Sequence, residues 1–190
     1  MSIDFAAQRA TMVESQVRTA DVTDHAIQDA MRAVPRERLL PADKAWAAYA
    51  DVEIEYAPGR WLLKPRDVAK LLQGLRPRAG ERALAIAAPY AAAVLEAMGL
   101  AVARLDERDL ARPAGEFDLA VSEGAVAEIP AGWRGVLVRP GGRLGVVERQ
   151  GPVARGVVIV RTEAGFGRMD FFDCGPPYMA GFEPKPALSF

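Results

Sequence analysis

Residues 82–105 read RALAIAAPYAAAVLEAMGLAVARL, and this stretch decides the fold. Two short apolar runs, Arg82–Ala87 and Leu100–Leu105, flank an alanine-rich segment, Tyr90–Met98, which Gly99 ends. Short apolar runs are typical of buried strands, and the segment between them has the length of a helix. A strand, a helix and a second strand in this order predict a βαβ unit with parallel strands.

The pattern continues downstream of this unit. A third apolar run, Phe117–Ser122, extends the predicted parallel sheet. Three further strands are predicted at Arg143–Arg149, Val153–Thr162 and Gly167–Asp173, the last two as an antiparallel pair joined by a turn with glycine. The tail, Gly175–Phe190, is rich in proline and glycine and is expected to run as extended coil.

One segment between the predicted strands fits two structures. Residues 125–138 can form a short helix that a Pro-Gly-Gly turn at 140–142 separates from the next strand. By periodicity alone, residues 135–138 and 143–147 form a hairpin instead. The local pattern does not decide between them.

The first 78 residues are predicted to be a mainly helical lead. Residues 51–64 are expected to be irregular, with a turn at Pro58-Gly59, and Arg36-Glu37-Arg38 to be a local ion-pair cluster. The size of the chain favours one compact domain, with the lead at 1–78 and an α/β core at 79–190. Four helices are predicted: over residues 4–18, 24–34, 42–49 and 65–75. Thr23 is expected to cap the second of them, with Asp24 in its first turn.

Composition excludes several classes of function. Hydrophobic residues make up 51% and charged residues 26% of the chain, which is typical of a globular protein. The net charge of -1 lacks the basic excess of a nucleic-acid or membrane-surface binder. No apolar run has the length of a membrane span or the form of a signal peptide. We therefore expect a cytoplasmic protein that binds neither nucleic acid nor membranes.

The chain contains one cysteine and one histidine. A single cysteine excludes an internal disulfide, which is typical of a reducing compartment, and a zinc site of Cys/His type would need other ligands. Cys174 has no basic neighbour in sequence that would lower its pKa, and it is expected to be inert. His25 is expected to face solvent. No metal site is predicted.

Several longer motifs run in order along the chain. Met-Val-Glu-Ser-Gln-Val-Arg at 12–18 is the most specific of them, whereas Arg-Pro-Gly-Gly-Arg-Leu at 139–144 is common in methyltransferases at large. Together the motifs resemble the family of protein-L-isoaspartate O-methyltransferases. The other blocks that carry this resemblance are residues 30–37 with Pro41, 48–51, 65–72, 116–121, 137–144 and 181–183.

The resemblance implies the class I methyltransferase fold, a Rossmann-like doubly wound sheet that ends in an antiparallel hairpin. It also implies S-adenosylmethionine as cofactor and, as substrate, the free carboxylate of isoaspartyl residues in damaged proteins or peptides. Methyl transfer from a sulfonium needs little acid or base work, so catalysis is mostly positioning. Folds of this kind hold the cofactor at the turn after the first strand, with an acid after the second strand for the ribose.

The turn after the first strand departs from the family's pattern. The family carries an acidic residue followed by Gly-x-Gly-x-Gly, where this chain has Ala85-Ile86-Ala87-Ala88-Pro89-Tyr90. Glycines at such a turn let backbone N–H groups approach the cofactor closely. We therefore expect a degraded cofactor site, in which Ala87, Pro89 and Tyr90 hold the positions beside the cofactor.

The interval after the second strand is also shorter than in the family. Residues 107–115 must reach the next strand, and a strand with its own crossover helix takes about a dozen residues or more. One strand–helix unit, and with it one wall of the cofactor pocket, is therefore expected to be missing. A trimmed sheet exposes an edge strand, which a homodimer would cover.

The stretch that the resemblance assigns to the substrate has changed as well. The family carries Gly-Gln-Thr-Ile-Ser-Gln before the matching proline, and this chain carries Gly59-Arg60-Trp61-Leu62-Leu63-Lys64. Trp61 and Leu63 replace the hydroxyls that would orient a carboxylate. Arg60 and Lys64 could still attract an anion, as flexible charges without that geometry.

Each remaining candidate has a functional and a structural interpretation. Asp106 stands where the family has its ribose-binding acid, or it is a solvated carboxylate at a strand end. Tyr90 stacks on a ligand, or it lines the core. Glu123, expected just past the end of a strand, is a site residue or part of a helix cap. Trp61 belongs to a partner-binding patch, or it fills the space of an absent ligand.

These observations lead to one expectation with two alternatives. The chain is expected to be a family member with a degraded S-adenosylmethionine site and weak or lost methyl transfer. The first alternative is a non-catalytic binding or scaffold module that uses the Trp61 loop and the proline-rich tail. The second is an enzyme for another nucleotide-like ligand in the altered cleft.

Overall fold

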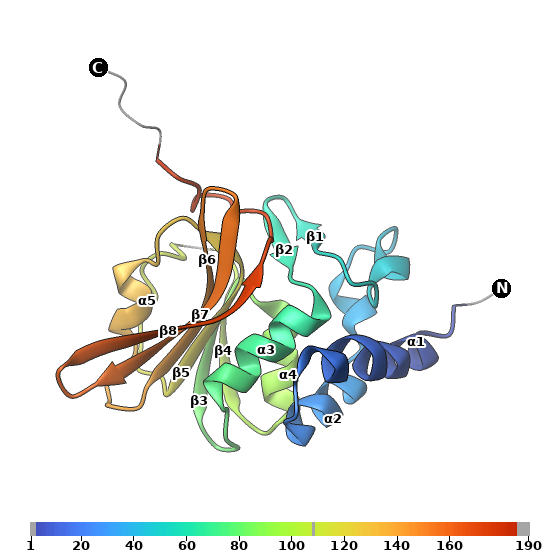
Figure 1. Ribbon diagram of the computed structural model, residues 1–190, viewed down its shortest axis with the longest axis horizontal. Coiled ribbons are helices and arrows are strands. Elements are labelled where there is room, and N and C mark those ends of the chain that lie inside the picture. The colour runs from blue at the N-terminus through green and yellow to red at the C-terminus, as the bar shows by residue number, and fades with distance from the viewer. Residues whose placement is uncertain (1–2, 108, 186–190) are drawn as a thin grey trace.

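The computed structural model describes residues 3–107 and 109–185, and a six-stranded sheet forms its centre (Figure 1). The strands lie in the order β4-β3-β5-β6-β7-β8; the first four are parallel, and β7 runs antiparallel to both of its neighbours, β6 and β8. This confirms the predicted parallel sheet with its C-terminal hairpin. The bounds are β3 (Arg82–Ile86), β4 (Ala101–Leu105), β5 (Leu119–Val126), β6 (Arg143–Gln150), β7 (Val153–Thr162) and β8 (Gly165–Cys174).

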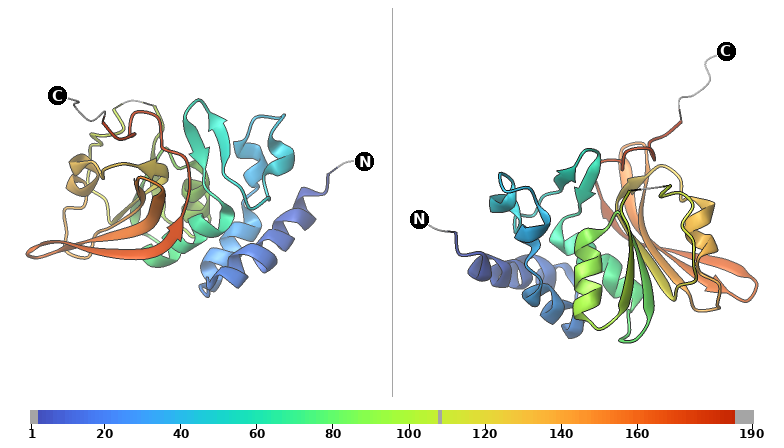
Figure 2. Two further views of the ribbon diagram at one scale, coloured as in Figure 1. Left: turned by 45° about the horizontal axis from the view of Figure 1, so that its top comes forward. Right: turned by 180° about the vertical axis from the view of Figure 1, so that it is seen from behind.

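Helices cover both faces of the sheet (Figure 2). The larger hydrophobic cluster joins one face to the lead, and Met31, Leu72 and Tyr90 are among its fully buried members. The smaller cluster lies on the other face, around Trp133. The first face carries α3 (Pro65–Leu75) and α4 (Pro89–Ala97), with α2 (His25–Ala33) and α1 (Phe5–Met12) packed outside them, and the second face carries α5 (Ala131–Gly135).

The strand order fixes where a ligand site would lie. From β3 the chain moves to β4 on one side, and the next strand, β5, lies on the other side of β3. In open α/β sheets the crevice at such a switch point, beyond the carboxyl ends of the strands, is the usual ligand site. The turn after β3 and the start of α4 lie at this point.

Two predictions for residues 42–64 are wrong in part. Residues 51–64 contain a hairpin, β1 (Ile54–Ala57) and β2 (Arg60–Leu62), whose turn has Gly59 at φ 65°. Strands this short have too few alternating apolar and polar residues for the periodicity of the sequence to indicate a strand. The helix predicted over 42–49 is reduced to a 3₁₀ turn, η4 (Ala45–Ala47).

The helical interpretation of residues 125–138 is the correct one, but the helix is shorter. α5 begins after Pro130 and ends at Gly135, and β6 follows a turn at 139–142. The helix cannot begin at 125 because β5 continues to Val126. The hairpin interpretation is wrong.

The N-terminal lead begins as predicted and then changes its winding. α1 continues into a π-helix, η1 (Val13–Val17), and a 3₁₀ turn, η2 (Arg18–Ala20). Asp24, rather than Thr23, caps α2, because its side chain accepts hydrogen bonds from Ala26 N and Ile27 N.

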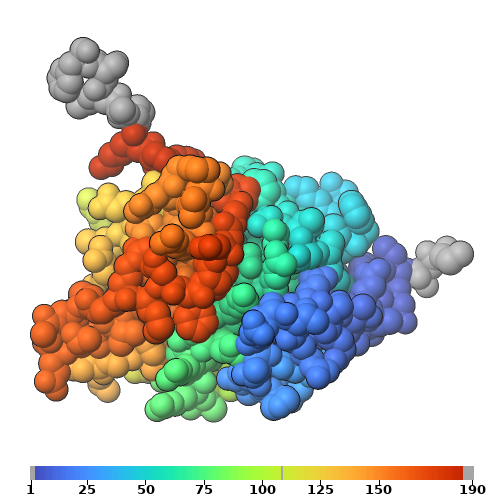
Figure 3. Space-filling model, in the orientation of Figure 1, coloured from blue at the N-terminus to red at the C-terminus, as the bar shows by residue number. Residues whose placement is uncertain are grey.

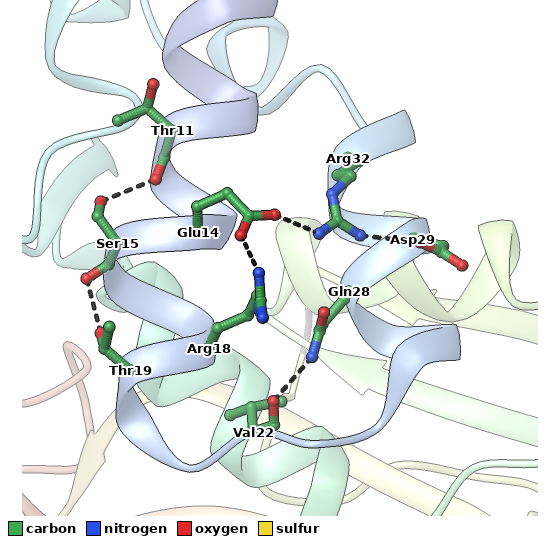
Figure 4. A network of polar contacts seen from close by, with 9 residues as sticks. All are labelled: Thr11, Glu14, Ser15, Arg18, Thr19, Val22, Gln28, Asp29 and Arg32. Carbon is green, nitrogen blue, oxygen red and sulfur yellow. Dashed lines mark hydrogen bonds and ion pairs between the residues drawn. The ribbon is translucent and has the colours of Figure 1, made fainter.

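Side chains on these elements connect the π-helix to α2 (Figure 4). Glu14 pairs with Arg18 and with Arg32, the latter at 2.7 Å, and Arg32 also reaches Asp29 at 2.8 Å. The two arginines, Arg32 foremost, hold the pKa of Glu14 below its usual range. Ion pairs therefore connect the helices of the lead on their outer surface, and hydrophobic packing connects them on their inner surface.

The shortened interval between β4 and β5 crosses the sheet as a loop. Its described residues, 106–107 and 109–118, form neither helix nor strand, in agreement with the predicted loss of one strand–helix unit. Leu110 and Phe117 are buried in the cluster around α5. The indole Nε1 of Trp133 donates a hydrogen bond of 2.5 Å to the carbonyl of Leu110. A few side chains thus cover the face that a helix would otherwise cover.

The described part of the tail returns to the sheet. Tyr178 forms an isolated parallel bridge with Ala125, and Ala180 N donates to Gly59 O at 3.0 Å. Residues 186–190 of the tail predicted as extended coil lie outside the described residues. No helix in residues 3–107 and 109–185 is long and apolar enough to cross a membrane.

Trp133 is expected to be a large contributor to stability. Trp133→Ala removes a fully buried indole and leaves the Leu110 carbonyl without a partner, so it should lower the free energy of unfolding by about 3–5 kcal/mol. Trp133→Phe keeps most of the packing and should cost about half as much. Urea denaturation measures both. A loss below about 1 kcal/mol for Trp133→Ala would contradict this account of the interval.

Candidate functional site

The turn after β3 keeps a backbone shape that usually requires glycine. Ala87 has φ 44°, in the left-handed region, and its N–H donates to Leu105 O at 2.8 Å. An L-residue with a Cβ pays about 1–2 kcal/mol for this conformation. Ala87 and Ala88 are fully buried, so their methyl groups pack against protein atoms. Side chains therefore fill the space beside this turn.

Glu123 lies beside this turn and is fully buried. It lies within β5, not after it, so the predicted position past the end of the strand is wrong. The pairing of β5 with β6 is irregular between Val121 and Ala125, and Gly124 has φ 110°. Such a bulge re-aims a side chain relative to a regular strand.

The Glu123 carboxylate accepts three backbone hydrogen bonds. Its Oε1 accepts from Tyr90 N at 2.9 Å and from Ala91 N at 2.8 Å, and its Oε2 accepts from Leu63 N at 3.2 Å. Tyr90 and Ala91 belong to the first turn of α4, whose N–H groups have no partner within the helix. An anion is favoured at such a helix start. Glu123 therefore caps α4, a helix that precedes it in the chain.

Arg36 completes the buried polar cluster. It is fully buried; its Nε donates to Ala48 O at 2.8 Å and its Nη2 to Leu63 O at 2.6 Å. Its guanidinium carbon lies 4.4 Å from the centroid of the Tyr90 ring, a cation–π distance. The predicted role in a local ion-pair cluster is therefore wrong for Arg36. Its position within the family-like block 30–37 was the one signal in the sequence that could have identified it.

Burial and charge act in opposite directions on this cluster. Burial raises the pKa of Glu123, while Arg36 and the three N–H groups oppose the rise. Burial lowers the pKa of Arg36, and Tyr90 and Glu123 oppose that shift. Burial also raises the pKa of Tyr90, whose hydroxyl has no hydrogen-bond partner among the described residues. Two charged groups buried together need partners: Glu123 has three N–H donors, and Arg36 donates through Nε and Nη2, while its Nη1 has no partner in the part of the chain that the structure describes.

The predicted cofactor residues are brought together in part. Pro89, at the first position of α4, and Tyr90 adjoin the Glu123 carboxylate, and Tyr90 is buried in the core. Ala87 lies at the preceding turn. Asp106 follows the end of β4 with an exposed side chain and makes no hydrogen bond or ion pair to Glu123.

The predicted substrate residues point to different partners. Arg60 Nη1 donates to Ala180 O at 3.0 Å, and Lys64 Nζ lies 3.8 Å from Glu53 Oε1. Trp61 is half-buried, and Leu63 is fully buried with its N–H on Glu123. Glu123 is therefore where the predicted substrate stretch meets the predicted cofactor stretch.

A second buried acid lies at the start of α3. Asp67 is 4% exposed, and its Oδ1 lies 3.7 Å from Arg66 Nε. Burial raises the pKa of Asp67 to about 6; Arg66 and Lys64 oppose the rise, and Glu53 adds to it. In the described part of the chain, no group of three or more His, Cys, Asp or Glu residues is arranged to hold a metal ion.

The sheet order and the placement of the cluster at its switch point define a class I methyltransferase fold. A protein-L-isoaspartate O-methyltransferase of Methylorubrum extorquens is 33% identical over 91% of this chain and 87% of its own length. One from Methylorubrum populi is 42% identical over 49% of this chain and 45% of its own length. No family model matches the chain.

A solved structure has the same fold. It is that of a putative protein-L-isoaspartate O-methyltransferase from Plasmodium falciparum in complex with S-adenosyl-L-homocysteine. It matches with a TM-score of 0.71 and 13% identity, over 90% of this chain and 97% of that one. On the match to the Methylorubrum extorquens protein, the chain belongs to the protein-L-isoaspartate O-methyltransferase family.

Glu123 is expected to stabilise the fold strongly. Glu123→Ala leaves three N–H groups without an acceptor and Arg36 without a balancing charge, and should cost about 3–5 kcal/mol. Glu123→Gln keeps one acceptor oxygen but also leaves Arg36 without a balancing charge, so it should cost about 2–3 kcal/mol. Urea denaturation at pH 7 compares the two. A cost below about 1 kcal/mol for Glu123→Ala would contradict the role assigned to this carboxylate.

Asp67 is expected to make stability depend on pH. Because the folded-state pKa of about 6 exceeds the unfolded value of 3.8, the contribution of this group is fully present below about pH 4 and is lost as pH rises to 6. The loss is about 3 kcal/mol. Asp67→Asn should therefore match the parent chain at pH 4 and exceed it by about 2–3 kcal/mol at pH 8. Parallel stability curves from pH 4 to pH 8 would contradict this.

Proposed function

We propose that this chain is a protein-L-isoaspartate O-methyltransferase family protein in which binding of S-adenosylmethionine, and with it methyl transfer, is weak or lost. The family's activity is methylation of isoaspartyl carboxylates in proteins or peptides. The proposal keeps the family's fold and its protein partners, and it assigns the changes to the cofactor position.

The observation that carries the proposal is the bonding of the Glu123 carboxylate. It occupies the N–H groups of Tyr90 and Ala91, which are the groups that an α/β fold offers to a bound ligand at this turn. A ligand at this position would have to displace a buried carboxylate that also bonds Leu63 N. The carboxylate therefore acts as an internal ligand.

The space beside the turn supports the same proposal. An adenosyl group needs room against backbone without side chains, and here Ala87, Ala88 and Tyr90 are fully buried. The residues at the turn therefore do not fit the cofactor. Asp106 is free to contact a ribose, but one exposed carboxylate does not replace the turn.

The substrate side supports weak activity independently of the cofactor. Methyl transfer depends on positioning, and a methyl acceptor must be held within about 3–3.5 Å of the reacting group. Arg60 is hydrogen-bonded to the tail, Lys64 is paired with Glu53, and Leu63 is buried. None of these side chains converges with another on a common point where a carboxylate would be bound.

The alternative of a binding module that uses the Trp61 loop has less support. Leu62 and Leu63 are fully buried, so Trp61 is the single member of this apolar triplet that reaches the surface. The described tail packs on the β1–β2 hairpin through Ala180. The loop therefore fills internal space more than it presents a patch.

Calorimetric titration with S-adenosylmethionine and with S-adenosylhomocysteine tests the proposal. We expect no saturable heat up to about 1 mM of either compound, corresponding to less than about 4 kcal/mol of binding free energy. We also expect no transfer of labelled methyl to an isoaspartyl peptide above the level without protein. Asp106→Ala, which changes an exposed carboxylate, serves as the matched control and should give the same blank titration.

Binding at about 10 μM or tighter, together with labelled methyl on the peptide, would overturn the proposal. Asp106→Ala would then be expected to weaken binding, because the acid after the second strand holds the ribose in such folds. Binding of S-adenosylmethionine without methyl transfer would mean that activity is lost only through the substrate site. It would contradict the role assigned to Glu123.

A further inference from the structure

The outer strand of the sheet, β8, has a free edge. β7 pairs with it along one side, and among the described residues no strand pairs with its other side. Arg161 on β7 exchanges backbone hydrogen bonds of 2.8 and 2.7 Å with Gly141 and Gly142, on the side of β6. Phe166 lies opposite Arg161, so its N–H and C=O point away from β7. By alternation, Arg168 and Asp170 also direct their backbone groups to the free edge.

This edge is long and apolar. Residues 166–171 are all exposed, and Phe166, Met169 and Phe171 keep 39%, 47% and 39% of their surface accessible. In the space-filling view the orange-to-red segment that contains β8 lies on the front surface (Figure 3). An exposed, apolar edge strand is a template for pairing with another strand.

The side chains of residues 167–170 alternate between two faces, and Phe171, at the bulge that follows, lies on the face of Met169. Met169 lies opposite Val158, which packs in the α3-side core, and Phe171 lies close to Gly74 of α3. Arg168 and Asp170 lie on the other face, where their side chains pair at 2.8 Å. The strand therefore shows charges on one face and apolar groups on the other.

We propose that β8 pairs in antiparallel fashion with β8 of a second copy of this chain, with the two-fold axis at Met169. This register places Arg168 opposite Asp170 of the other copy, twice, and Met169 opposite itself. It also places Phe171 opposite Gly167, where an aromatic ring covers the backbone of a glycine. The backbone groups of Arg168 and Asp170, which face the free edge, complete the ladder.

Charge selects this register over its neighbours. An axis at Arg168 places two arginines opposite each other, and an axis at Asp170 places two aspartates opposite each other. Like charges directly opposite are destabilising, whereas opposite charges stabilise a strand pair. An odd shift would place charged side chains against apolar ones. Asp170 pairs with Val157 and Phe172 with Gly156, so Phe171 is the extra residue of a bulge at the end of this stretch, and the regular alternation covers residues 166–170.

Glu148 and Arg155 limit the strength of the charge pairs. Arg168 also pairs with Glu148, and Asp170 with Arg155 at 3.0 Å. The inter-chain pairs therefore extend a network that exists within each copy. A five-residue ladder is also a small interface, so the dimer is expected to dissociate with a Kd of about 1–100 μM.

Sedimentation velocity from about 1 to 500 μM protein tests the pairing, and we expect the monomer to give way to a dimer across this range. Because residue 169 opposes itself, Met169→Lys and Met169→Glu should each weaken the dimer at least tenfold. An equimolar mixture of these two variants should regain it as a heterodimer. Trp46→Lys removes a side chain that is 67% exposed, on another element, and should leave the dimer unchanged.

Cysteine cross-linking tests the register. In a Cys174→Ser background, Met169→Cys places two thiols opposite each other at a separation of about 5 Å, and mild oxidation should give a covalent dimer. Phe166→Cys is the matched control, because in this register its two thiols lie about 20 Å apart. A parent chain that stays monomeric at 500 μM overturns the proposal. So does a dimer that Met169→Lys does not weaken, or equal cross-linking of both cysteine variants.

Discussion

The buried carboxylate of Glu123 holds together three segments that are far apart in the sequence. It accepts hydrogen bonds from the loop that follows β2 and from the start of α4, and it projects from the irregular middle of β5. Burying a carboxylate is costly unless hydrogen bonds and an opposite charge compensate for the lost water. Three N–H groups, the α4 dipole and Arg36 supply that compensation, so each part of the cluster depends on the others.

The shortened interval between β4 and β5 shows how the sheet remains covered after a strand–helix unit is lost. A sheet face must pack against another layer, and here Leu110 and Phe117 of the interval supply it together with Trp133 of α5. β4, now an edge strand, is short and carries Arg104, whose guanidinium pairs with Glu96 at 2.8 Å. Short length and charge are common protections of an edge. The opposite edge, β8, is long and has exposed apolar side chains, so the two edges differ in their capacity to pair.

The sequence predicted the elements in which one kind of signal dominates. β3, α4 and β4 follow from apolar runs around an alanine-rich helix, and α3 follows from Pro65 and its apolar stripe. The end of β5 was missed because Ser122-Glu123-Gly124 interrupts the apolar run inside the strand. Arg36 was missed for another reason. Its partners are the carbonyls of Ala48 and Leu63, 12 and 27 positions away, and no local pattern encodes such contacts.

An internal carboxylate and a bound ligand stabilise a fold in different ways. A ligand stabilises the folded state only in proportion to its concentration relative to its Kd, whereas Glu123 is covalently part of the chain and acts at any concentration. The start of α4 therefore has its anion whether or not a ligand is present. The same hydrogen bonds couple ligand access to the stability of the fold. Any change that frees the Tyr90 and Ala91 N–H groups for a ligand also removes their acceptor and leaves Arg36 buried without its counter-charge. In this chain, a change at Glu123 that opens the switch point to a ligand also lowers the stability of the fold.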